Sequence, residues 1–200
     1  AMEHVRADFT IREQASIHAM FANALASFGH LFPGLEVYHR AAQAYAKAIK
    51  DTQRTESPTN WAYLQRNMGT VLQAIGERGD DLETLGRAAE SYRAALEVFS
   101  LEATPFPWAT TQQKLGEVLY RLDIKTQKTK GIKEALILYQ GALKILTKRS
   151  TPHLWSETLN NFGQAAQVLG RELKSDEVLS RAIDAYTQAL TVRQRDTQPT

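Results

Sequence analysis

The sequence predicts an all-α protein built as an array of four helical hairpins. Three observations predict it: residue types recur at a fixed spacing, apolar residues follow helical spacing between them, and no useful length reads as β-strand. The spacing is 47 residues, because Trp61, Trp108 and Trp155 coincide when the sequence is shifted by that amount. A fixed period of this size is typical of a solenoid, in which each unit needs its neighbours to bury its apolar surface.

Other residue types keep the same spacing. The columns contain glycine (Gly69, Gly116, Gly163), tyrosine (Tyr45, Tyr92, Tyr139, Tyr186), proline (Pro58, Pro105, Pro152, Pro199) and alanine (Ala41, Ala88, Ala135, Ala182; Ala48, Ala95, Ala142, Ala189). The predicted units are residues 14–57, 58–104, 105–151 and 152–198, after a lead-in of residues 1–13. In the first unit, Gln14 takes the tryptophan position and Ala22 takes the glycine position.

Each unit is expected to form two helices. A hydroxyl residue precedes a proline at the start of three units (Ser57-Pro58, Thr104-Pro105, Thr151-Pro152). The hydroxyl is expected to cap the first helix, and proline suits the first helical position. Gly76 and Gly170 are expected to end the first helix, as glycine often does. The second helix of the second unit is expected to start near Leu82.

The small residues predict how the helices pack. A glycine in mid-helix, such as Gly69, costs about 1 kcal/mol relative to alanine. We therefore expect another helix to cross there too closely for a side chain, with Tyr92 and its equivalents placing their hydroxyl groups at the edge of the core. The tryptophans share one column with an apolar face behind them, so we expect them to pack in the core rather than to form a ligand cage.

Composition excludes several classes of function. The chain has 200 residues, is 43% hydrophobic and 23% charged, and carries a net charge of +2, so no global field recruits nucleic acid or anionic membrane. The absence of cysteine excludes a disulfide framework and a cysteine-based zinc or redox site, and it fits a reducing compartment. No apolar run approaches the length of a membrane span, and no signal peptide is recognisable. We expect a cytoplasmic protein.

No catalytic constellation is apparent. The histidines (His4, His18, His30, His39, His153) form no metal-ligand spacing, although His30 and His39 flank a turn and could approach each other. Acidic residues near helix starts, such as Asp80, Asp81, Glu172 and Asp176, are expected to cap helices rather than to act in acid–base chemistry. We therefore expect no enzyme, no cofactor and no metal site.

The motif of the third unit indicates a family. Trp108-Ala109 is followed by Leu115-Gly116 and Leu119, and then by Ala135, Tyr139 and Ala142 in the second helix. These units resemble tetratricopeptide repeats, of the long-period bacterial kind related to kinesin-light-chain-type repeats. The resemblance implies a right-handed superhelical solenoid whose first helices line a concave surface that binds peptides or other proteins.

The same resemblance assigns positions in the concave groove. They are Asn23 in the first unit; Tyr63, Arg66, Thr70 and Gln73 in the second; Gln113, Glu117, Tyr120 and Arg121 in the third; and Glu157, Asn160, Gln164 and Gln167 in the fourth. Amides can bond a peptide backbone, arginine can hold a carboxylate through two hydrogen bonds, and tyrosine provides contact area at low entropic cost. The alternative is that these side chains are solvated residues on an exposed helix face.

Residues 121–149 are strongly basic. Eight basic side chains (Arg121, Lys125, Lys128, Lys130, Lys133, Lys144, Lys148, Arg149) face Asp123 and Glu134, a local charge of +6. A solvated loop explains the connector that contains Lys125, Lys128 and Lys130, followed by Lys133; a docking patch for an acidic partner or nucleic acid is the alternative. The connector contains no aromatic residue, which argues against single-stranded nucleic acid.

The last unit is expected to lack a cap. Ala182, Ile183, Tyr186 and Ala189 would have no neighbour, whereas solenoids normally cover this surface with polar residues. We expect either further repeats in a longer protein or a homo-oligomer formed through this end. Our first functional hypothesis is a scaffold that binds a protein or peptide in its groove. The second is a structural or self-associating segment, and the third is a basic patch at residues 121–149.

Overall fold

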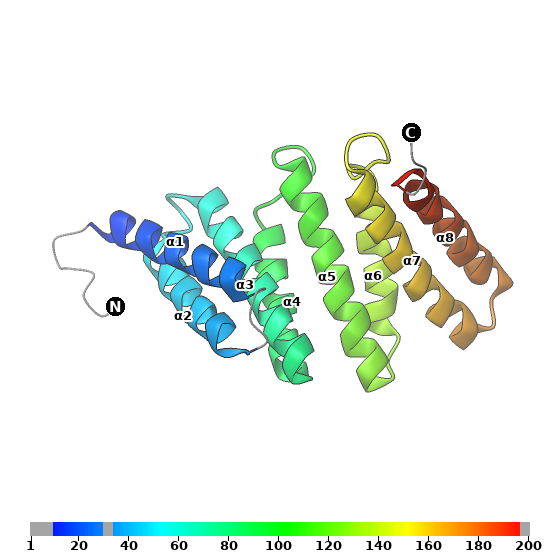
Figure 1. Cartoon of the computed structure of the whole chain (residues 1–200), viewed down its shortest axis with the longest axis horizontal. Helices are drawn as coiled ribbons and strands as arrows, with labels where there is room; N and C mark the ends of the chain where they lie inside the picture. The colour runs from blue at the N-terminus through cyan, green and yellow to red at the C-terminus, as the bar shows by residue number, and fades with distance from the viewer. Residues whose placement is uncertain (1–9, 30–33, 197–200) are drawn as a thin grey trace. The chain divides into compact units, whose positions relative to one another are not determined.

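The computed structural model describes residues 10–29 and 34–196, and these residues form helices without any strand. The helices are α1 (Ile11–Gly29), α2 (Glu36–Asp51), α3 (Pro58–Gly79), α4 (Leu82–Leu96), α5 (Pro105–Thr126), α6 (Lys130–Ala142), α7 (Pro152–Leu173) and α8 (Asp176–Asp196) (Figure 1). The prediction of an all-α fold is confirmed.

Backbone contacts divide the chain into two compact units, which meet in sequence at Phe99 and Ser100. Unit 1 contains α1 to α4, and unit 2 contains α5 to α8. Within each unit, consecutive helices pair as hairpins, and the second helix of one hairpin packs on the first helix of the next: α2 on α3, and α6 on α7 (Figure 1).

The first helices of each unit also touch one another. α1 contacts α3 in unit 1, and α5 contacts α7 in unit 2, whereas the described residues of α2 and α4, or of α6 and α8, make no such contact. Within each unit the first helices are therefore drawn together and the second helices are spread apart. We call the first-helix side the inner side of each unit.

Glycine and tyrosine columns bring the two helices together in three of the four described hairpins. A β-carbon added to Gly69 would lie 2.8 Å from the ring of Tyr92, and one added to Gly163 would lie 2.7 Å from the ring of Tyr186. The third hairpin repeats the relationship, with 2.7 Å between a β-carbon at Gly116 and the Tyr139 ring. The predicted close helix crossing at the glycine column is confirmed.

The helix ends differ from the sequence prediction. α3 continues past Gly76 to Gly79, and α7 continues past Gly170 to Leu173, so the prediction that Gly76 and Gly170 end the helices was wrong. Both glycines instead admit a leucine of the following helix: a β-carbon at Gly76 would lie 2.7 Å from Leu85 Cγ. The left-handed residues that end the three long first helices are Asp80, Gln127 and Lys174, with φ of 50°, 53° and 50°.

The expected hydroxyl caps are also wrong. Ser57, Thr104 and Thr151 precede their prolines as expected, but none of the three side chains bonds the first turn of its helix. The hydroxyl of Thr104 instead accepts from the backbone N–H of Ser100 at 3.0 Å, and that of Thr151 accepts from Thr147 at 3.1 Å. The ψ angles of the two threonines are 60°, outside the extended region of a side-chain cap, so these hydroxyls close the preceding turn.

The second helix of the second unit starts where the sequence placed it. α4 begins at Leu82, and the carboxylate of Asp81 accepts from the backbone N–H groups of Glu83 and Thr84, at 3.0 and 3.2 Å. The expectation that this acidic residue caps a helix is confirmed. Trp108 packs against a buried cluster of Ala109, Ala142 and Leu146, as expected of a core residue.

Candidate functional site

A cleft of about 720 Å³ opens on the inner side of unit 1. It lies between α1 and α3 and is also lined by the segment that joins α2 to α3. The lining residues are Thr10, Ile11, Ala15, Ser16, Ala19, Asn23, Asp51, Thr52, Gln53, Glu56, Ser57, Asn60, Tyr63, Leu64 and Asn67. Its volume falls within the range of about 300–1,000 Å³ that is usual for ligand pockets.

Asparagine side chains bridge the two helices of the cleft. Asn67 of α3 donates through Nδ2 to Oδ1 of Asn23 on α1 at 3.2 Å, and the Tyr45 hydroxyl donates to the same oxygen at 2.5 Å. Burial raises the pKa of Tyr45 to about 12, against smaller opposing effects of the hydrogen bond with Asn67 and the charge of Arg66. Tyr45 therefore remains a hydrogen-bond donor at neutral pH and fixes the Asn23 side chain from beneath.

An aromatic wall stands beside these amides. The Arg66 guanidinium lies over the Tyr63 ring, 5.1 Å from its centroid, and donates to Oδ1 of Asn67 at 3.3 Å. The Tyr63 ring also meets the ring of Phe99 edge-on at 5.0 Å between centroids. Tyr63 is therefore held on both sides and presents a fixed apolar surface to the cleft.

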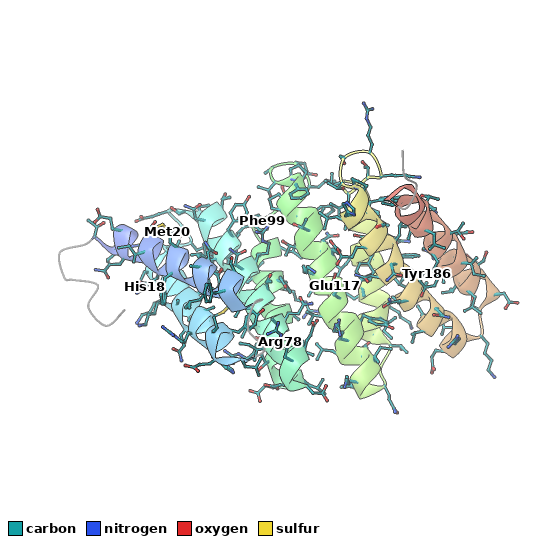
Figure 2. The ribbon with its side chains drawn as sticks, in the orientation of Figure 1. His18, Met20, Arg78, Phe99, Glu117 and Tyr186 are labelled. Atoms are coloured by element: carbon teal, nitrogen blue, oxygen red, sulfur yellow. The ribbon has the colours of Figure 1, made fainter. Side chains whose placement is uncertain are left out.

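A histidine and a carboxylate meet beside the cleft. His18 is buried, and its Nδ1 lies 3.3 Å from Oδ2 of Asp51, which is one of the lining residues. The pair is ionic only when His18 is protonated. Figure 2 labels His18 on α1.

The inner side of unit 2 has different chemistry. The partly buried carboxylate of Glu117 accepts from Lys114 Nζ at 2.9 Å and from Asn161 Nδ2 at 3.0 Å, and Lys114 also lies 4.0 Å from Glu157 (Figure 2). Burial, followed by the charge of Glu117, raises the pKa of Tyr139 far above its ordinary value. This cluster spans α5 and α7, as the asparagines span α1 and α3, but its polar groups are charged and mutually paired.

A second hollow of about 480 Å³ lies between α7 and α8. It is lined by His153, Ser156, Glu157, Asn160, Tyr186, Ala189, Leu190 and Val192. Apolar side chains of α8 form one wall, and polar side chains of α7 form the other.

The sequence-predicted groove residues are distributed unequally. Asn23 and Tyr63 line the unit 1 cleft, and Glu157 and Asn160 line the unit 2 hollow. Gln73 and Gln113 are 8% and 1% exposed, so both are interior side chains. The others are exposed or partly buried on first helices: Arg66, Thr70, Glu117, Tyr120, Arg121, Gln164 and Gln167.

Several of the predicted groove residues accept hydrogen bonds from the hydroxyl groups of the tyrosine column. The Tyr92 hydroxyl donates to Gln73 Oε1 at 2.9 Å and to Thr70 Oγ1 at 3.2 Å, and the Tyr186 hydroxyl donates to Gln167 Oε1 at 3.4 Å. Gln73 is thereby bound within its own hairpin. The role of the predicted groove residues in binding a partner stays a prediction.

Sequence reasoning missed Asn60 and Asn67, which line the cleft between α1 and α3. A signal for Asn67 was present, because the column that it shares with Lys114 and Asn161 is polar in three units and lies two residues before the glycine column. Asn67 and Asn161 both donate to the residue 44 positions earlier, Asn23 and Glu117 respectively.

The basic connector forms an exposed turn between α5 and α6. Lys125, Lys128, Lys130 and Lys133 are all exposed. Beneath them, the buried carboxylate of Asp123 accepts from the backbone N–H of Ile132 at 3.0 Å. The start of α6 is therefore already satisfied by an internal anion.

Among the described residues, no group of three or more histidine or acidic side chains is arranged to hold a metal ion. The suggested approach of His30 to His39 lies partly outside the described residues, because His30 is among those left out. None of the helices in the described ranges combines the length and apolar character needed to cross a membrane.

The fold has relatives among solved structures. The crystal structure of BtubC (BKLC) from P. vanneervenii matches with a TM-score of 0.57 and 18% identity, over 98% of this chain and 70% of that chain. The de novo designed helical repeat protein DHR64 (TM-score 0.43, 16% identity, 92% and 95% covered) and the MamA protein (TM-score 0.34, 16% identity, 94% and 97% covered) are less similar. No protein-family model matches the chain, and no curated protein does.

The stacked hairpins and the likeness to BtubC define the class of fold as a tetratricopeptide-like helical repeat.

Proposed function

We propose that the chain is a non-enzymatic scaffold that binds an extended segment of a protein or peptide on the inner, first-helix side of its repeats. The observation that carries the proposal is the cleft between α1 and α3, with its bridging amides and fixed aromatic wall. We place the protein in the cytoplasm, in keeping with the absence of cysteine.

The chemistry of the cleft favours an extended peptide. Asn60 and Asn67 can donate to and accept from a peptide backbone, whose two polar groups per residue need both, and Asn23, whose Oδ1 already accepts two hydrogen bonds, can still donate. Ala15, Ala19 and Leu64 provide an apolar floor for alternate side chains. Amides can hydrogen-bond the backbone of a peptide, and small apolar groups can contact its side chains, without strong selection for one peptide sequence.

A random-sequence peptide display library selected on the immobilised chain tests the proposal. The double variant Asn60→Ala, Asn67→Ala should lose the selected peptides, because it removes two amides of the cleft wall. The matched control is Gln43→Ala, Gln188→Ala, which removes two exposed amides from second helices. Selected peptides that bind both variants equally would show that the cleft is not the site.

The basic connector is a second candidate site. Lys125 lies at the end of α5, Lys128 in the turn, and Lys130 and Lys133 at the start of α6, and all four are exposed. An acidic protein segment or nucleic acid is the partner that their charge suits. Binding of this kind weakens steeply with salt. An arbitrary DNA duplex that fails to bind at low salt, together with an acidic peptide that also fails, would remove this candidate.

A structural role in a longer or self-associating array is the third candidate. It is favoured by the exposed apolar side chains of α8, of which Ile183 is 64% exposed.

A further inference from the structure

The hydrogen bonds that bridge α1 and α3 occupy the amide oxygens of the bridge. The Arg66 guanidinium donates to Oδ1 of Asn67 at 3.3 Å, and Nδ2 of Asn67 donates to Oδ1 of Asn23 at 3.2 Å. The Tyr45 hydroxyl donates to the same Asn23 oxygen. Both amide oxygens therefore already accept from donors of the chain itself, and the Asn23 oxygen accepts twice.

The polar groups that the bridge leaves for a ligand are N–H groups. An asparagine side chain has two N–H donors, so Asn67 keeps one of its own and Asn23 keeps both. In the described part of the chain, no acceptor receives a hydrogen bond from Nδ2 of Asn23. Both asparagines line the cleft. Linked hydrogen bonds also polarise one another, so the charge of Arg66 makes Asn67 a stronger donor. The bridge therefore favours a ligand group that accepts hydrogen bonds.

Ordinary peptide residues suit this bridge poorly. Each residue other than proline carries one backbone N–H donor for every C=O acceptor. When such a C=O accepts from the bridge, the neighbouring N–H enters the cleft beside further donors, and a buried N–H without an acceptor costs free energy. Proline has no backbone N–H. A segment rich in proline therefore offers the acceptors without the unpaired donors.

The Tyr63 ring gives such a segment a surface to pack on. Tyr63 stands about one helical turn before Asn67 on α3 and lines the same cleft. Its ring is fixed by the Arg66 guanidinium, 5.1 Å from the centroid, and by the Phe99 ring at 5.0 Å. Phe99 is itself only 2% exposed. Grooves lined by fixed aromatic rings are a recurring means of recognising proline-rich segments.

We propose that the segment bound in the cleft is proline-rich and adopts the polyproline II conformation. A proline ring lies against Tyr63, and a backbone C=O accepts from the N–H groups of Asn23 and Asn67. This inference rests on the peptide binding proposed above and names the class of peptide. A polyproline II segment has no internal hydrogen bonds, so its C=O groups are available. It also loses little conformational entropy on binding, because proline fixes φ.

Fluorescence anisotropy with two labelled probes tests the inference. One probe is an oligoproline of about ten residues, which spans roughly 30 Å as a polyproline II helix. The other is a glycine-serine repeat of the same length, which carries an N–H on every residue. The oligoproline should bind more tightly by about tenfold or more. An oligoproline that does not bind, or that binds no more tightly than the glycine-serine repeat, would overturn the inference.

The variant Asn23→Asp tests the N–H groups of the bridge. The aspartate keeps the oxygen that accepts from Tyr45 and Asn67, but it replaces both N–H donors by a second oxygen. The affinity for the oligoproline should therefore fall about tenfold or more. The matched control is Gln43→Glu, which makes the same chemical change on an exposed side chain of α2 and should leave the affinity unchanged. Equal affinities of Asn23→Asp and the wild-type chain would overturn the inference.

Two variants of Tyr63 test the aromatic wall independently of the bridge. Tyr63→Leu removes the ring and should weaken binding of the oligoproline, whereas Tyr63→Phe keeps the ring and should retain it. Circular dichroism checks that each variant is folded. A folded Tyr63→Leu chain that binds the oligoproline as tightly as the wild-type chain would overturn the packing of proline on this ring.

The random-sequence library distinguishes failure of this inference from failure of the proposed function. Selected peptides that depend on Asn60 and Asn67 and are enriched in proline would support both. Selected peptides that depend on these asparagines without any excess of proline would support the proposed function and overturn the inference. Failure of both the selected peptides and the oligoproline to bind the cleft would overturn both.

Discussion

The ring of Tyr92 lies against the backbone of Gly69, so closely that a β-carbon added to the glycine would be 2.8 Å from two of the ring atoms. Tyr92 is fully buried, so its ring has no room to withdraw. The same relationship recurs in the next two hairpins. The contact between Gly69 and Tyr92 allows α3 and α4 to cross closely. It also places the Tyr92 hydroxyl within hydrogen-bond distance of Thr70 and Gln73 on α3.

This contact predicts opposite effects for two glycines. Gly69→Ala should lower the free energy of unfolding, because overpacking costs about 1–3 kcal/mol and exceeds the gain in helix propensity of about 1 kcal/mol. The control is Gly86→Ala in α4, where an added β-carbon meets nothing within 4 Å. Gly86→Ala should raise the free energy of unfolding by about 0.5–1 kcal/mol. Urea denaturation measures both, and equal effects would contradict the packing account.

A second prediction concerns the buried carboxylate of Asp123. It accepts from the Ile132 N–H at the start of α6, where Thr129 provides no side-chain cap. Asp123→Ala should destabilise the chain by about 1–2 kcal/mol, through the lost cap and the buried N–H left unpaired. Asp123→Asn keeps an acceptor and should recover part of the loss. The exposed Asp184→Ala is the control, and a loss no larger than that of the control would refute the cap.

The third prediction is a loss of stability at alkaline pH. Burial raises the pKa of Tyr45 from 10.0 to about 12. An unfolded chain releases this proton near the ordinary pKa of 10.0, whereas the folded chain keeps it until about 12. The contribution of Tyr45 is therefore fully present below pH 10.0 and is lost as pH rises toward about 12.

Urea denaturation at several alkaline pH values measures this decline. Its slope from one tyrosine is at most about 1.4 kcal/mol per pH unit. Tyr45→Phe should flatten the decline without abolishing it, because burial also raises the pKa values of Tyr120, Tyr139 and Tyr186. An unchanged slope in the variant would show that Tyr45 titrates alike in both states.

The fourth prediction separates two arginines that the sequence placed in one groove. Arg66 is stacked on Tyr63 and bonded to Asn67, beside the cleft. Arg66→Ala should release the Tyr63 ring and weaken binding of a selected peptide about tenfold, the effect of about 1.4 kcal/mol. Arg121→Ala, an exposed arginine of unit 2, should leave the affinity unchanged. Fluorescence anisotropy of the labelled peptide measures both, and the reverse order of effects would move the site to unit 2.

The repeat period made much of the fold predictable. The glycine and tyrosine columns correctly indicated a close helix crossing, because Gly69 is costly in a helix unless another side chain needs its space. The ends of the first helices were not predictable in the same way. Gly76 suits a helix end and a close contact equally well, and only the position of Leu85 shows that it serves the contact.

The candidate site was less predictable than the fold. Asn23 and Tyr63 were found through the family pattern, but Asn60 and Asn67 line the same cleft and were missed. The pattern says which residues share a helix face, whereas the cleft depends on the separation of α1 from α3. The interior position of Gln113 illustrates the same limit, because the sequence shows an amide and not its depth.

The central claim is that an extended segment binds between α1 and α3, and backbone amide chemical shifts measured during titration with a selected peptide test it most directly. The account predicts that the largest shift changes fall on Asn23, Asn60, Tyr63 and Asn67, with little change on α4. Changes confined to the second helices or to the turn between α5 and α6 would contradict it.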